Sequence, residues 1–167
     1  MAPPVTLSPI FLVTGKFSPV INDSSKVTST IFTEEFTILE NNLIKLSISN
    51  KGGKIASVTI KDENTDQGKP VTLFNSDDTN FGLAFKGTAG FVNTSNFAFN
   101  KVNATAQQVT MQMVNADGSS VSYTYSLAPN SNKVGFTAQL KGFQSKIESN
   151  SLTLNWDTKL LQQEKDI

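Results

Sequence analysis

The chain has 167 residues, 38% of them hydrophobic, and its 14 basic residues balance its 14 acidic residues, so its net charge at neutral pH is zero. This length fits one globular domain, because a chain of this size buries about two-thirds of the surface that it exposes when unfolded. The sequence contains no His, Cys or Arg. Their absence excludes Ser-His-Asp and Cys-His nucleophiles, zinc sites built from Cys or His, and arginine clamps for phosphate. A neutral chain without arginine is also a poor partner for nucleic acid, and we expect none.

Residues 1–33 differ in composition from the rest and are predicted to form an arm and a linker outside the folded domain. Prolines at positions 3, 4, 9 and 19 surround the apolar run Ile10–Val13. Proline at this density forbids a helix, so we expect an extended arm with one short edge strand. Residues 22–30 (NDSSKVTST) have the composition of a flexible tether. The domain is assigned to residues 34–167, and no window of about 20 apolar residues predicts a membrane-spanning helix.

From residue 34 onward, apolar residues recur at every second position, which is the pattern of strands with one buried face. Asn41-Asn42 is expected to turn the chain through positive φ angles, and Gly52-Gly53 and Asp117-Gly118 mark further tight turns. We therefore predict an all-β fold, an antiparallel β-sandwich, and only residues 159–167 are compatible with a helix. The expected one-faced strands contain Ile44/Leu46/Ile48, Ala56/Val58/Ile60, Val71–Phe74, Phe81/Leu83/Phe85, Phe97/Phe99, Val109/Met111/Met113, Val121/Tyr123/Tyr125/Leu127, Val134/Phe136/Ala138/Leu140 and Leu152/Leu154/Trp156.

One loop, Asp62 to Gly68, carries oxygen-bearing side chains at alternate positions, as hard cations such as Ca²⁺ prefer. An EF-hand loop requires Gly at its sixth position and Glu at its twelfth, but Gln67 and Leu73 occupy these positions. We therefore favour a solvated turn between strands over a calcium site, and we predict neither a metal nor a cofactor.

Two pairs of adjacent carboxylates, Glu34-Glu35 and Asp77-Asp78, offer the groups for glycosidase chemistry, which needs two carboxyl groups about 5–10 Å apart. Adjacent side chains on a strand point to opposite faces. We therefore favour a role in keeping loops and edge strands in solvent, and we predict no catalytic residue.

The large aromatic and thioether side chains have two possible uses. Trp156, Tyr123 and Tyr125 could form a platform on which sugars stack, and Met111 and Met113 could form an adaptable peptide-binding surface. All five alternate with other apolar residues along their predicted strands. This spacing favours core packing over a binding surface for each of them.

A series of ordered segments between Phe36 and Asp166 is specific when taken together. The segments are 38–45 (ILENNLIK), 48–55 (ISNKGGKI), 57–58 (SV), 68–70 (GKP), 73–74 (LF), 80–83 (NFGL), 123–127 (YTYSL), Trp156 and 163–165 (QEK). In this order they resemble the first half of the large periplasmic domain of the YidC family of membrane protein insertases, in the version found in Bacteroidetes-like bacteria.

This resemblance implies a β-supersandwich similar to galactose mutarotase, located in the periplasm between a first membrane helix and a five-helix insertase core. It implies anchoring in the inner membrane only through helices that this chain lacks, with residues 22–30 as the tether. Mutarotases use His for proton transfer, so fold analogy supports no enzyme in a chain without His. The implied role is a chaperone-like one, which assists insertion and folding of inner-membrane proteins through contacts with Sec translocon accessory subunits or nascent client segments.

A second class of function stays open, a carbohydrate-binding or carbohydrate-active sandwich of the bacterial envelope.

Because the family's domain continues beyond residue 165, we also expect an uncovered strand edge or apolar face. Either the fragment self-associates through this face, or the arm at Ile10–Val13 folds over it. The strand positions expected to face solvent, and so to meet partners, are Ser122, Thr124, Ser126 and Thr137.

Overall fold

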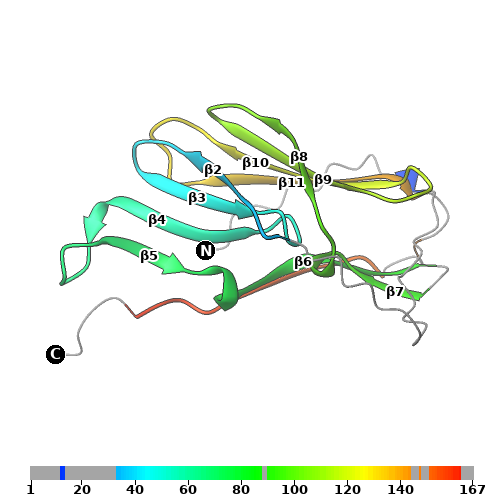
Figure 1. Ribbon diagram of the computed structural model, residues 1–167, viewed down its shortest axis with the longest axis horizontal. Coiled ribbons are helices and arrows are strands. Elements are labelled where there is room, and N and C mark those ends of the chain that lie inside the picture. Colours follow the sequence, from blue (N-terminus) through cyan, green and yellow to red (C-terminus); the bar gives the residue numbers. More distant parts are fainter. Residues whose placement is uncertain (1–11, 14–32, 88–89, 144–146, 148–150, 163–167) are drawn as a thin grey trace.

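A computed structural model describes residues 12–13, 33–87, 90–143, 147 and 151–162 of the chain. The described residues form three β-sheets with two short 3₁₀ helices, η1 (Ser76–Asp78) and η2 (Thr94–Asn96) (Figure 1). Every strand pair is antiparallel except the pair of β1 with β11. The predicted all-β antiparallel sandwich is confirmed, whereas the likeness to galactose mutarotase stays a prediction.

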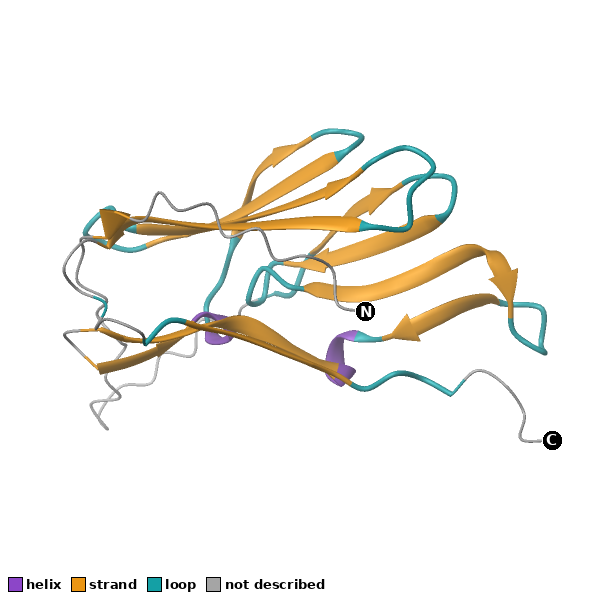
Figure 2. Cartoon of the chain, turned by 180° about the vertical axis from the view of Figure 1, so that it is seen from behind, coloured by secondary structure: helices purple, strands orange, loops and turns teal. Residues whose placement is uncertain are grey.

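The largest sheet has five strands in the spatial order β1-β11-β10-β9-β8. A three-stranded sheet has the order β12-β6-β7, and a four-stranded sheet has the order β2-β3-β4-β5. Figure 2 shows the five-stranded sheet as a layer above the three-stranded one, with the four-stranded sheet at one end. The strands are β1 Leu12–Val13, β2 Phe36–Glu40, β3 Ile44–Ser49, β4 Ile55–Asn64, β5 Pro70–Phe74, β6 Thr79–Gly87, β7 Gly90–Asn93, β8 Asn100–Ala104, β9 Gln108–Val114, β10 Ser120–Leu127, β11 Val134–Phe143 and β12 Thr153–Thr158.

One apolar core joins the three sheets, and strands with period-two sequences supply most of it. The inward residues of β10 have exposed fractions of 0–1%, and those of β9 have 0–3%. Met111 and Met113 are therefore core residues, as predicted. The other core side chains are Leu39, Ile44, Leu46, Ile48, Phe81, Leu83, Phe85, Val92, Phe99, Ala138, Leu140 and Phe143.

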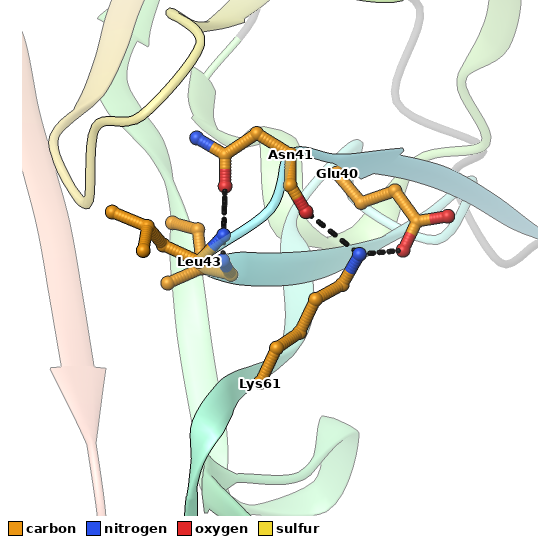
Figure 3. Close-up of polar contacts among 5 residues, drawn as sticks. Glu40, Asn41, Leu43 and Lys61 are labelled. Carbon is orange, nitrogen blue, oxygen red and sulfur yellow. Dashed lines mark hydrogen bonds and ion pairs between the residues drawn. The ribbon is translucent and has the colours of Figure 1, made fainter.

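The hairpin predicted at Asn41-Asn42 joins β2 to β3, but the mechanism expected for its turn was wrong. Asn130 is the one described non-glycine residue with a positive φ, at 56°. Instead, the Asn41 side-chain oxygen accepts a hydrogen bond from the backbone N–H group of Leu43 at 2.8 Å (Figure 3). It accepts another from the N–H group of Ile44 at 2.9 Å. An Asn side chain can replace a backbone carbonyl in this way, so the turn needs no left-handed residue.

One predicted strand is absent. Phe97 and Phe99 belong to no strand, because Phe97 follows η2 and Phe99 enters the core just before β8 begins. The structure instead has a strand, β8, that was not predicted and whose five residues are all exposed. In the region compatible with a helix, residues 159–162 are not helical: the N–H groups of Lys159 and Leu161 donate to the carbonyls of Asp78 and Leu73, each at 2.8 Å. Residues 163–167 lie outside the described part.

The short edge strand expected in the arm is present as β1, which pairs with the outer edge of β11. Ile10 and Phe11, and the proposed tether at residues 22–30, lie outside the described residues.

Candidate functional site

The candidate cation loop, Asp62 to Gly68, is closed by its own hydrogen bonds. The Thr65 N–H donates to the Lys69 carbonyl at 2.8 Å, and the Gly68 N–H donates to the Thr65 carbonyl at 2.9 Å. The Thr65 hydroxyl oxygen also accepts from the N–H groups of Gln67 and Lys69. Within the described ranges, no three His, Cys, Asp or Glu side chains come together as a metal site would require. The hydrogen bonds within the loop make it a closed turn between β4 and β5.

The first carboxylate pair splits between two environments. Glu35 is exposed, whereas Glu34 is half-buried and accepts hydrogen bonds from the Ser49 and Ser76 hydroxyls, at 2.5 and 3.2 Å. Beside it, the Lys54 ammonium donates to the carbonyls of Ser76 and Thr79, both at 2.7 Å. Burial lowers the pKa of Lys54, and the negative charge of Glu34 opposes this shift. Glu34 therefore links the residues before β2 to β3 and η1, and Lys54 links the residue before β4 to η1 and β6, so both charged groups have a structural use.

The second carboxylate pair, Asp77-Asp78, lies at the junction of η1, β6 and β12. Together with Asp157, these residues line a hollow of about 420 Å³. Lys159 lies in the same lining. Three acidic residues and one lysine give this corner of the surface a net negative charge.

Both tyrosines of the candidate sugar platform are buried in the core. The Tyr123 hydroxyl lies 2.6 Å from the Thr94 hydroxyl and accepts from the Leu83 N–H at 3.2 Å. The Tyr123 ring stacks on the Phe99 ring, with ring centroids 5.0 Å apart. Burial raises the pKa of Tyr123 to about 12. The Tyr125 hydroxyl donates to the Gly53 carbonyl at 2.7 Å, and burial raises its pKa as well. Neither ring offers a face to a sugar.

Trp156 is not the core residue that the sequence predicts. Its side chain is 43% exposed, although it packs edge-on against Phe81 with ring centroids 5.7 Å apart. The indole N–H donates to the Thr158 hydroxyl at 2.9 Å, which fixes the ring. Trp156 is exposed because β12 is an edge strand, and no further described strand covers that side of the sheet.

Several apolar side chains on and next to β11 and β12, Trp156 among them, are incompletely covered, and we call this set the open side. Its residues pack against the core but stay partly exposed. The Phe81 ring contacts two of them, Phe136 with ring centroids 5.2 Å apart and Trp156 with ring centroids 5.7 Å apart. Among the described strands, β12 pairs only with β6, so its other edge has free backbone groups. The uncovered edge and face expected from the sequence are therefore present here. The open side consists of Val134 and Phe136 of β11, Leu152 next to β12, and Leu154 and Trp156 of β12.

The positions expected to face solvent are only partly accessible. Thr137 is exposed and Thr124 and Ser126 are half-buried, but Ser122 is buried, with 8% exposure. Ser122 does lie on the outer face, between its register partners Gln112 and Gln139, and Gln112 donates to its hydroxyl at 2.9 Å. The longer side chains cover the small serine, so alternation gave the right face but the wrong exposure.

The described residues thus define an all-β sandwich domain with a partly exposed apolar side and, at β12, an edge to which no further described strand pairs. A sequence model of the YidC periplasmic domain matches residues 37–166, and the chain belongs to this family. The family confirms the resemblance and the predicted periplasmic location. No helix in the described part is long and apolar enough to cross a bilayer.

Several curated relatives are named membrane protein insertase YidC. The protein from Phocaeicola vulgatus is 35% identical over 135 residues, which cover 80% of this chain and 22% of that protein. The protein from Parabacteroides distasonis is 33% identical over 137 residues (80% and 22%), and that from Bacteroides fragilis is 31% identical over 134 residues (79% and 22%). The chain therefore spans about a fifth of the length of these relatives. No solved structure matches the chain significantly.

Proposed function

We propose that this domain assists the insertion and folding of inner-membrane proteins without catalysing a reaction, as a partner-binding module of a YidC insertase. Its partners are nascent client segments or accessory subunits of the Sec translocon. Membrane helices outside this chain anchor it in the inner membrane. The family match supports this role, since relatives that are 31–35% identical are named insertases.

The observation that carries the proposal is the free edge of β12 beside the exposed Trp156. An edge strand offers a row of unpaired N–H and C=O groups, and an extended peptide can add to it as a further strand. Such binding needs backbone groups and no catalytic residue. A side chain of the added strand would cover Trp156, and aromatic residues of this kind supply much of the binding energy at interfaces.

Crosslinking in cells, with photoreactive residues placed in the full-length insertase that carries this domain, tests the proposal. Thr153 and Asp157 are exposed outer-face positions of β12, and Lys101 and Asn103 are matched exposed positions on the edge strand β8. We expect adducts to nascent clients or Sec subunits from β12 and none from β8. Equal labelling of both edges, or no adducts at β12, would contradict a partner site at this edge.

One observation favours a second candidate, a carbohydrate-binding role: the exposed ring of Trp156. An aromatic ring at the surface is the usual platform for a sugar. Quenching or a spectral shift of Trp156 fluorescence by envelope glycans would support this role. An unchanged emission at millimolar glycan would leave the partner-binding module alone.

A further inference from the structure

The backbone of β12 offers hydrogen-bonding groups on the side away from β6, where no other described strand pairs with it. Just after β12, the Lys159 N–H donates to the Asp78 carbonyl at 2.8 Å, in the register that β12 and β6 share. Hydrogen-bonded and non-hydrogen-bonded pairs alternate along an antiparallel ladder. The N–H and C=O groups of Leu154 and Trp156 therefore point away from β6, and an added strand would bond to these two residues.

The side chains of the same two residues are apolar and share one face of the sheet. Leu154 and Trp156 lie opposite Leu83 and Phe81 of β6, which are both buried in the core. Both side chains on β12 are incompletely covered. Residues directly opposite each other on neighbouring strands project to the same face. An added strand would therefore cover Leu154 and Trp156 best with apolar side chains at every second position.

The two ends of β12 differ in charge. At its C-terminal end, Asp157 is exposed and lines the acidic hollow together with the two aspartates of η1. The neighbour at the other end is a lysine, Lys86 of β6, whose backbone N–H donates to the Ser151 hydroxyl at 3.2 Å. A cation on an added strand would be attracted to the end at Asp157 and disfavoured at the end near Lys86.

We propose that the partner segment at β12 is an extended peptide with apolar residues at alternate positions and a Lys or Arg opposite Asp157. The segment adds antiparallel to β12, which is the direction of every described strand pair except β1 with β11. Its basic residue therefore precedes its apolar residues in the sequence. This inference rests on the proposed function and specifies the chemistry of the partner.

Two capped peptides of equal composition test the proposal when they are titrated into the chain. One reads Ser-Gly-Lys-Val-Thr-Val-Thr-Gly-Ser, which places its Lys opposite Asp157 when its two Val residues lie opposite Trp156 and Leu154. The other is the reversal of this sequence. Trp156 is the only tryptophan in the chain, so its emission reports binding at this edge. We expect the first peptide to shift the emission to shorter wavelength and to bind about three- to fivefold more tightly than its reversal at low salt.

Two variants and a change of salt assign this preference to the charge at the edge. Asp157→Asn should remove most of the preference, whereas Glu63→Gln, which removes an exposed carboxylate of β4, should leave it unchanged. About 1 M salt should also remove it, because the Debye length then falls to about 3 Å.

The outcomes separate this inference from the proposed function. Equal affinity for the two peptides, tighter binding of the reversal, or a preference that persists in Asp157→Asn would overturn the inference and leave β12 as a binding edge. Binding of neither peptide at millimolar concentration would overturn both the inference and the partner site at β12.

Discussion

Replacement of Asn41 by alanine removes a side chain that holds two turns at once. Within the β2–β3 turn, its side-chain oxygen accepts from the N–H group of Leu43 (Figure 3) and from that of Ile44. Its amide nitrogen donates to the carbonyls of Ala128 and Ser131, at 2.8 and 2.7 Å, in the connection between β10 and β11. Asn41 therefore shapes one hairpin and ties the four-stranded sheet to the five-stranded sheet.

The expected cost follows from these four hydrogen bonds. At a net contribution of about 0.5–1.5 kcal/mol each, they would sum to about 2–6 kcal/mol. At a partly exposed turn, water can replace some of the lost hydrogen bonds. We therefore expect Asn41→Ala to lower the free energy of unfolding by about 2–3 kcal/mol. The Lys61 ammonium binds the Asn41 backbone carbonyl and the Glu40 carboxylate, both at 2.7 Å, and the substitution leaves these contacts in place. For a chain of this length the Tm should fall by about 5–10 °C.

Urea denaturation followed by Trp156 fluorescence measures this loss of stability. Two control variants separate the contribution of the β2–β3 turn from that of the contacts between the sheets. Asn42 makes one contact across the same turns, accepting from the Asn130 N–H at 3.1 Å, so Asn42→Ala should cost about 1 kcal/mol or less. Asn41→Asp keeps the acceptor for the β2–β3 turn but places a carboxylate against the Ala128 and Ser131 carbonyls. It should be destabilised through the inter-sheet contacts alone. If Asn41→Ala and Asn42→Ala cost the same, the assignment of the turn to the Asn41 side chain is refuted.

Three further predictions concern the core, alkaline pH and metal. Gly53 and Gly68 both have positive φ angles, +63° and +73°, but a methyl group on Gly53 would lie 2.8 Å from the Phe99 ring, whereas one on Gly68 would meet nothing within 4 Å. Gly53→Ala should therefore lower the free energy of unfolding in urea by about 2–4 kcal/mol, and Gly68→Ala by about 1 kcal/mol. Equal costs would show that backbone conformation alone matters. Because the pKa of Tyr123 is raised to about 12, its hydroxyl keeps its proton in the folded state at a pH near 10, where the unfolded state loses it. The free energy of unfolding should therefore fall as the pH rises from 10 to 12. In Tyr123→Phe this fall should be smaller by up to about 3 kcal/mol, and an unchanged pH profile would count against the burial of the hydroxyl. Neither EDTA nor added calcium should change the Tm, since Asp62 to Gly68 closes through its own backbone, and a rise with calcium would contradict the solvated turn.

The sequence predicted the strands that supply most of the core. Along β10, polar residues alternate with Val121, Tyr123, Tyr125 and Leu127, and these four side chains are buried together. The Asp117-Gly118 turn joins β9 to β10 as its residue types indicate. Ordered segments rather than a single motif indicated the family, and the match over residues 37–166 confirms it.

The tertiary structure decided what lies against each strand, because alternation tells which side chains share a face but not what covers that face. Trp156 continues the inward pattern of Leu154, yet it is exposed because β12 is the last strand of its sheet. Ser122 follows the outward pattern, yet longer neighbours bury it. Coverage depends on residues distant in sequence, and the open side, which is the candidate partner site, could be located only from the packed sheets.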